Sequence, residues 1–165
     1  MNPDVIAFRE EFGIPRDENR FRVICADGAD YVERLGLSQD VILADACDRG
    51  GIAPELDAIE FYQAARRCLF GGGVFVANMC GDPDDWAKHI AKIRTVFGDD
   101  IVTLQVRPDG NVIVFAFKER LPAIDWEQLE ATAADLKRRF GLDFPRYVRR
   151  IAIDWRLRRW QHLFA

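Results

Sequence analysis

The sequence has little that would bind a metal ion or cross a membrane. It contains two histidines, and none of its four cysteines forms a Cys-x-x-Cys pair, so we expect neither a metal site nor cysteine catalysis. No apolar run approaches the roughly 20 residues of a membrane span. The first residues have neither the basic start nor the apolar centre of a secretory signal. These absences predict a cytoplasmic protein with reduced cysteines, no metal and no membrane partner.

Excess positive charge is also missing. The formal net charge is -4 and the pI is near 5.2, which argues against a protein that coats nucleic acid. The carboxyl-terminal tail is the exception, because arginines alternate there with aromatic residues such as Tyr147, Trp155 and Trp160. Such a helix could bind RNA, an acidic partner or a membrane surface. We favour an amphipathic helix whose aromatic side chains pack and whose arginines are solvated, and expect no nucleic-acid partner.

Strand and helix patterns alternate along most of the chain. The patterns predict helices over Asp4–Phe12, Ala29–Leu35, Glu55–Leu69 and Pro83–Phe97, and strands over Phe21–Ala26, Asp40–Ala44, Val74–Met79, Ile101–Val106 and Val112–Phe117. The last two strands are joined by a short turn and should form an antiparallel hairpin. The order predicts an α/β sheet that is mostly parallel, with the antiparallel hairpin at one edge.

The character changes to helices after Pro122. The patterns predict helices from Asp125 or Trp126 to Phe140 and from Phe144 to Phe164. We therefore expect an α/β domain over residues 1–120 and a helical extension over residues 121–165. Gly71–Gly73 precedes a strand, whereas phosphate-binding loops follow one, so we expect a structural turn there.

The most informative stretch is the apolar run Val41–Ala44, which ends on Asp45 and carries Asp48 three positions later. A buried strand that ends in carboxylates places charge at the carboxyl edge of a sheet. Open α/β proteins bind their ligands at that edge. Asp45 could equally cap a loop or pair with an arginine such as Arg49.

Several segments in order resemble the spermidine synthase family, the polyamine aminopropyltransferases. The resemblance covers roughly residues 2–118 and is carried by the stretches Asn2–Ile6, Phe12–Pro15, Arg22–Val32, Asp40–Asp48, Glu60–Tyr62 and Leu69–Ala77. It implies the Rossmann-like fold of class I S-adenosylmethionine-dependent methyltransferases. The helical tail lies outside it.

The resemblance implies a role for each candidate residue. Asp27, with Gly28 after it, would bind the adenine amino group of decarboxylated S-adenosylmethionine or S-adenosylmethionine, although Asp27 could also be a helix N-cap. Asp45 would be the catalytic base that takes a proton from the attacking amine, and Asp48 would hold the polyamine. A carboxylate suits this role because it attracts a cationic amine and accepts its proton.

Family members have further elements before the matching region. They begin with a small β-rich domain, followed by a strand with a Gly-rich loop for the methionine portion and a strand ending in the acid that holds the ribose. The first two core strands of the sheet are therefore expected to be missing here. The resulting gap between Phe21–Ala26 and Asp40–Ala44 could be filled by an upstream segment, by direct pairing of these two strands, or by a second chain in a homo-oligomer such as a dimer.

The acceptor motif departs from the family as well. Cys47-Asp48-Arg49 stands where the family usually has Ser-Asp-Pro, and Arg49 would repel a polyamine. Three functions stay open: aminopropyl transfer to a diamine such as putrescine, methyl transfer on the same fold, or a non-catalytic interaction module.

Overall fold

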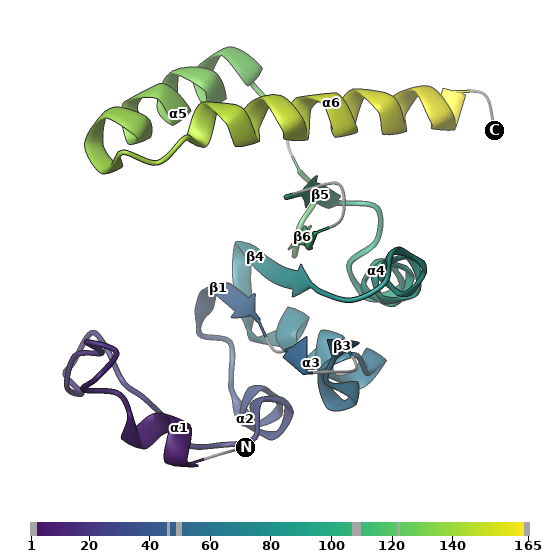
Figure 1. Ribbon diagram of the computed structural model, residues 1–165. Helices are drawn as coiled ribbons and strands as arrows, with labels where there is room; N and C mark the ends of the chain where they lie inside the picture. Colours follow the sequence, from purple (N-terminus) through teal and green to yellow (C-terminus); the bar gives the residue numbers. More distant parts are fainter. Residues whose placement is uncertain (1–2, 46, 49–50, 107–109, 122, 164–165) are drawn as a thin grey trace.

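The structure is a computed structural model that describes residues 3–45, 47–48, 51–106, 110–121 and 123–163 (Figure 1). Side chains are not described for residues 47, 48, 51, 83, 84 and 157–163. The helices are α1 (Pro3–Ala7), α2 (Gly28–Arg34), α3 (Ile59–Cys68), α4 (Pro83–Phe97), α5 (Trp126–Phe140) and α6 (Phe144–Leu163), with a 3-10 turn η1 at Pro54–Leu56. The strands are β1 (Gln39–Ala44), β2 (Cys47–Asp48), β3 (Gly51–Ile52), β4 (Leu69–Met79), β5 (Ile101–Gln105) and β6 (Val112–Phe117).

The main sheet has four strands in the order β1-β4-β6-β5. β1 is parallel to β4, and β6 is antiparallel to both β4 and β5. Three strands therefore run in one direction and β6 runs against them. This confirms the expected α/β sheet with an antiparallel hairpin of β5 and β6.

The glycine run lies inside β4 rather than before it. β4 begins at Leu69, directly after α3, and its register with β1 shifts between Gln39↔Leu69 and Val41↔Val74. Gly72 has φ +75°, a conformation that side chains with a Cβ rarely adopt. The glycines thus form an irregularity that realigns β4 with β1, which is why the structural turn expected there appears as an irregular part of the strand.

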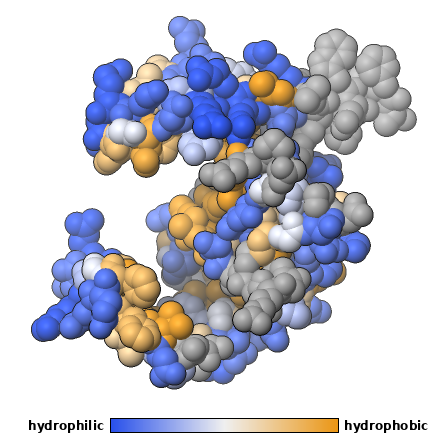
Figure 2. All heavy atoms as spheres, in the orientation of Figure 1, coloured by the Kyte–Doolittle hydropathy of each residue, from blue (hydrophilic) through white to orange (hydrophobic). Residues whose placement is uncertain are grey.

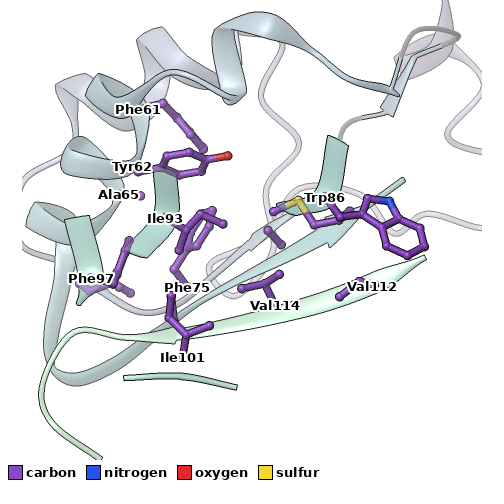
Figure 3. Packing of buried hydrophobic residues seen from close by; sticks show 14 residues of the cluster. Phe61, Tyr62, Ala65, Phe75, Trp86, Ile93, Phe97, Ile101, Val112 and Val114 are labelled. Atoms are coloured by element: carbon purple, nitrogen blue, oxygen red, sulfur yellow. The ribbon is translucent and has the colours of Figure 1, made fainter. Parts of the chain in front are cut away.

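The core lies between one face of the sheet and the helices α3 and α4 (Figure 3). Its centre is Phe75 of β4, which is fully buried and stacks on Phe97 of α4 with ring centroids 5.7 Å apart. Phe61 and Tyr62 of α3 contact the same ring edge-on from 6.0 and 5.8 Å. Burial of aromatic area of this kind is the main stabilising term in the core.

α5 and α6 cover the opposite face of the sheet near β5 and β6 (Figure 1). Asp125 caps α5 by accepting a hydrogen bond from the Gln128 N–H, and Gly141 ends the helix with φ +72°. Val148 of α6 is buried, and Arg150 donates to the carbonyls of Gln105 and Val106 at the end of β5. The favoured packed-helix interpretation of the tail holds only in part, because Val148 packs but Tyr147 is exposed and Arg150 is bonded to the sheet edge rather than solvated, and the Trp160 side chain lies outside the described residues.

The amino-terminal segment departs from expectation. Phe21–Ala26 does not form a strand: within the described residues its one β-bridge joins Glu18 to Phe21. A strand requires a hydrogen-bonding neighbour, and no described segment lies alongside. The direct pairing of this segment with β1, one of the alternatives for the gap, is therefore wrong.

The first helix is also shorter than the prediction of Asp4–Phe12, because α1 ends at Ala7 and turns follow up to Gly13. No residue of α1 is buried, so tertiary packing does not extend the helix. No described helix is long and apolar enough to span a membrane.

The cysteines follow the prediction in one case. Cys68 is buried, its thiol lies 3.2 Å from the Val32 carbonyl, and burial raises its pKa. Cys25 is exposed rather than buried, and Cys80 is disulfide-bonded rather than reduced, so the expectation of reduced, buried cysteines is wrong for these two.

Candidate active site

Asp45 follows the last residue of β1 at the carboxyl edge of the sheet, where the sequence places it. Its side chain is exposed and its Oδ1 accepts a hydrogen bond of 2.8 Å from Asn78 Nδ2. Ala44 of β1 pairs with Ala77 of β4, so the parallel register brings the next residues, Asp45 and Asn78, side by side. The carboxylate is thus fixed through one oxygen at an accessible edge.

A second asparagine extends this contact. Asn111, directly before β6, donates from Nδ2 to Asn78 Oδ1 over 2.9 Å. Asn111, Asn78 and Asp45 therefore form a chain across three adjacent strands, and it orients the amide of Asn78 toward the carboxylate. Neither asparagine is expected from the sequence pattern, although one signal is present: Asn78 is the polar residue in the apolar strand Val74–Met79.

The acceptor motif after Asp45 forms a two-stranded antiparallel ribbon. Cys47 pairs with Ile52 and Asp48 with Gly51. The Asp48 side chain and the whole of Arg49 lie outside the described residues. The amine-binding role of Asp48 therefore stays a prediction.

Asp27 is the N-cap of α2. Its Oδ1 accepts hydrogen bonds from the backbone N–H groups of Ala29 and Asp30, at 2.9 and 3.1 Å. The capping alternative is therefore confirmed. Both bonds end on Oδ1, so capping does not occupy Oδ2, and the side chain is exposed.

Leu56 connects the start of α2 with the Asp45 edge. A Cβ on Gly28 would lie 3.6 Å from Leu56 Cδ2, an ordinary contact. Leu56 in turn lines a cavity of about 10 Å³ together with Ala44 and Asn78. η1 therefore lies next to both the start of α2 and the carboxyl end of β1.

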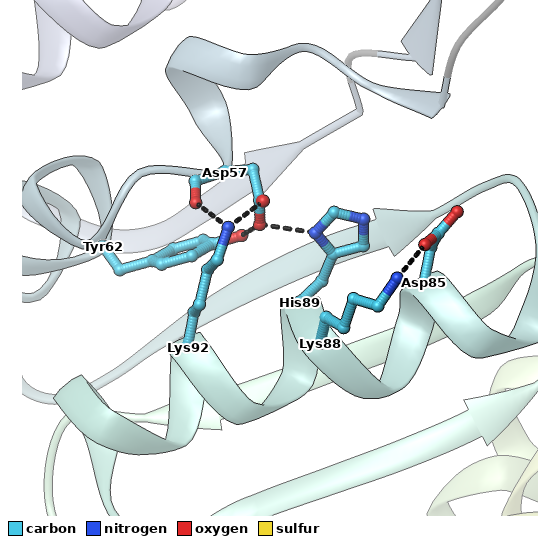
Figure 4. A network of polar contacts seen from close by, with 6 residues as sticks. All are labelled: Asp57, Tyr62, Asp85, Lys88, His89 and Lys92. Atoms are coloured by element: carbon cyan, nitrogen blue, oxygen red, sulfur yellow. Dashed lines mark hydrogen bonds and ion pairs between the residues drawn. The ribbon is translucent and has the colours of Figure 1, made fainter.

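A buried polar network lies beside the candidate site (Figure 4). Asp57, at the end of η1, is contacted by three side chains. Tyr62 donates its hydroxyl to Oδ1 over 3.2 Å, His89 Nδ1 lies 2.5 Å from the same oxygen, and Lys92 Nζ donates to Oδ2. These contacts join the loop after the site to α4. Asp57 and its partners were not expected from the sequence, because their spacing along the chain does not reveal the contact.

Opposing effects act on the Asp57 carboxyl. Burial raises the pKa of this carboxyl. Hydrogen bonds from Lys92 and His89 lower it by more than burial raises it, so the net pKa is below the ordinary value of 3.8. Burial, with the Asp57 charge, raises the pKa of Tyr62. Asp57 is therefore ionised and Tyr62 neutral at pH 7, and the network fixes the loop rather than supplying a proton.

The family is decided by a match over more than half of the chain. Residues 6–99 match the model of the spermine/spermidine synthase domain. The chain belongs to the spermine/spermidine synthase family. The matched range includes Asp27, Asp45 and Asn78, whereas Asn111 and the helices α5 and α6 lie beyond it.

Individual relatives support this membership. The chain is 36% identical over 152 residues to a polyamine aminopropyltransferase of Chromobacterium violaceum, and the aligned region covers 92% of this chain and 58% of that protein. A spermidine synthase in complex with the transition-state analogue AdoDATO is 27% identical, with a TM-score of 0.57 over 76% of this chain and 46% of the other. This family member therefore spans about half the length of the relatives it matches.

A further structure agrees in fold alone. Human methyltransferase-like protein 13 in complex with SAH has a TM-score of 0.68 at 23% identity over 83% of this chain and 67% of the other. This confirms the expected methyltransferase-type, Rossmann-like fold for the spermine/spermidine synthase family member.

Proposed function

We propose that this chain takes part in aminopropyl transfer from decarboxylated S-adenosylmethionine to a diamine such as putrescine. The observation that carries the proposal is Asp45, held by Asn78 at the carboxyl edge of β1. Family membership and relatives named polyamine aminopropyltransferase support it. The homo-oligomer expected from the sequence stays a prediction.

The reaction needs a neutral amine at a cationic centre. The amine nitrogen donates its lone pair to the methylene carbon beside the sulfonium, the carbon–sulfur bond breaks, and its electrons leave on sulfur as a neutral thioether. The nitrogen must then lose a proton. Asp45 is assigned this proton, because one of its oxygens is held by Asn78 while the carboxylate stays exposed to an incoming amine.

The remaining residues bind and orient the reactants. Asp48 is proposed to hold the distal ammonium of the diamine by charge. Asp27 is proposed to accept the adenine amino group on Oδ2 while Oδ1 caps α2. Gly28, the first residue of α2, is proposed to lie beside the adenine together with Asp27.

The matched variants Asp45→Asn and Asp40→Asn test the assignment. Asp40 is an exposed aspartate at the other end of β1, so both changes remove one charge from the same strand. With decarboxylated S-adenosylmethionine and putrescine, we expect Asp45→Asn to lower kcat by roughly 10²-fold or more and Asp40→Asn to leave it unchanged. Mass-spectrometric detection of spermidine and methylthioadenosine measures this. Equal turnover by both variants, or methyl transfer from S-adenosylmethionine instead, would contradict the proposal.

A further inference from the structure

A polar cavity lies between the carboxyl-terminal parts of α3 and α4. These helices pack against each other on one face of the sheet (Figure 1). The cavity has a volume of about 350 Å³ and is lined by Gln63, Arg66 and Arg67 of α3 and by Thr95 and Val96 of α4. Its four polar lining residues are exposed, so the cavity is open to solvent. A volume of this size is in the range of small-molecule sites.

The cavity and the candidate active site lie at opposite ends of β4. α3 ends at Cys68, directly before β4 begins, whereas Asn78, which holds Asp45, is the penultimate residue of that strand. Nearly the whole length of β4 therefore separates Arg66 and Arg67 from the Asp45 carboxylate. A ligand in this cavity would not contact the residues assigned to aminopropyl transfer.

The cavity carries positive charge that no carboxylate balances. Among the described residues neither Arg66 nor Arg67 forms an ion pair, and no acidic residue belongs to the lining. Arg66 Nη2 donates to the Lys118 carbonyl over 3.1 Å, which orients the guanidinium. The Lys118 ammonium adds a third positive charge where it donates to the Leu69 carbonyl. Burial raises the pKa of Cys68, and the charges of Arg67 and Lys118 oppose that rise.

The helix ends at the cavity do not cancel this charge. The carboxyl-terminal ends of α3 and α4 each carry about half a negative elementary charge. Together they offset about one of the three positive charges on Arg66, Arg67 and Lys118. Arg94, in the last turn of α4, adds a further positive charge. The local field therefore favours an anion.

The placement of the two arginines indicates which kind of anion fits. Successive residues of a helix point about 100° apart, so Arg66 and Arg67 reach the cavity from different directions. Each guanidinium is a planar fork that matches two oxygens of a phosphate. We propose that this cavity binds a small molecule with a diphosphate group, one guanidinium on each phosphate and the Gln63 amide as a further donor. The site is independent of the proposed aminopropyl transfer.

Calorimetry on the full 165-residue chain tests the proposal with inorganic pyrophosphate, ADP and adenosine as separate ligands. We expect saturable binding of pyrophosphate and ADP, and much weaker binding of adenosine. Tighter binding of ADP than of pyrophosphate identifies a nucleotide as the source of the diphosphate, and equal binding identifies free diphosphate. Adenosine binding as tight as that of ADP overturns the proposal, because the phosphates would then contribute nothing.

A matched pair of double variants locates the site. Arg66→Gln with Arg67→Gln removes two charges from the last turn of α3 and should weaken pyrophosphate binding by roughly a hundredfold. Arg138→Gln with Arg139→Gln removes two charges from the last turn of α5, where Asp135 already pairs with both arginines. This control should leave binding unchanged. Its positions are exposed, in a layer of helices whose face in Figure 2 is largely hydrophilic.

A single variant separates binding from folding. Gln63→Glu keeps the shape of an exposed side chain and places a carboxylate three and four residues before the two arginines, where it can pair with them. We expect at least a roughly tenfold loss of pyrophosphate affinity with an unchanged melting temperature. No binding by the wild-type chain, equal losses in the two double variants, or full binding by Gln63→Glu overturns the proposal. Losses confined to the α3 variants support it.

Discussion

The two edges of the sheet differ in how completely the chain covers them. At the β5 edge, α5 and α6 pack on the sheet and Arg150 bonds the end of β5. At the β1 edge, Val41 and Leu43 are exposed, and within the described residues no strand lies beside the segment Phe21–Ala26, which has only the bridge from Glu18 to Phe21. The contrast shows that a sequence pattern becomes a strand only where the chain also supplies the strand beside it.

The largest expected effect concerns the core between these edges. Phe75→Ala removes a fully buried ring that contacts Phe61, Tyr62 and Phe97. We expect it to lower the free energy of unfolding by about 4 kcal/mol. Leu43→Ala, on the open face of β1, should change it by less than about 0.5 kcal/mol. Urea denaturation of both variants measures the difference, and a large loss in Leu43→Ala would show that the β1 face is covered in the free chain.

This contrast also explains what could be predicted from the sequence. β6 was predicted to the residue and β5 to within one, because their apolar positions are buried in the structure. The end of α4 at Phe97 was also predicted, and β1 to within one residue, although the expectation that β1 is buried is wrong because Val41 and Leu43 are exposed. Phe21–Ala26 has an equally good pattern and fails, because pairing depends on residues far away or on another chain. At the site, Asp45 could be found from its place after a strand, whereas Asn78 is identified by a register that only the folded sheet reveals.

A smaller effect is expected at Asp57, whose contacts connect the loop after Asp45 to α4. Asp57→Asn keeps the shape of the side chain but removes the charge that faces His89 and Lys92, at an expected cost of about 2 kcal/mol. Because the folded-state pKa of Asp57 is lowered, its contribution is fully present above the unfolded value of 3.8 and is lost as the pH falls through the folded pKa.

Acid titration of stability checks this sign. In a titration from pH 5 downwards, the difference in stability between the wild-type chain and Asp57→Asn should shrink below about pH 4. Asp85→Asn is the control, because Asp85 pairs with Lys88 on the surface of α4, the helix that carries His89 and Lys92, and an exposed ion pair contributes little to stability. A difference that grows as the pH falls would contradict the assignment.

The smallest expected effects concern the two aspartates that cap helices near opposite edges of the sheet. Asp27 caps α2 near the open edge and Asp125 caps α5 near the covered one. Each alanine variant should lose about 1 kcal/mol in urea denaturation. Only Asp27→Ala should also weaken methylthioadenosine binding in calorimetry. Equal ligand binding by both variants would leave Asp27 as a cap alone.

Hydrogen–deuterium exchange of the free full-length chain tests the difference between the edges most directly. We expect rapid exchange in residues 21–26, apart from the Phe21 and Val23 amides, which donate to the Glu18 carbonyl and the Asp17 carboxylate, and slow exchange in β6 (Val112–Phe117), which has a strand on both sides. Protection of residues 22–26 equal to that of β6 in the free chain would contradict it, because this segment would then already belong to a closed sheet.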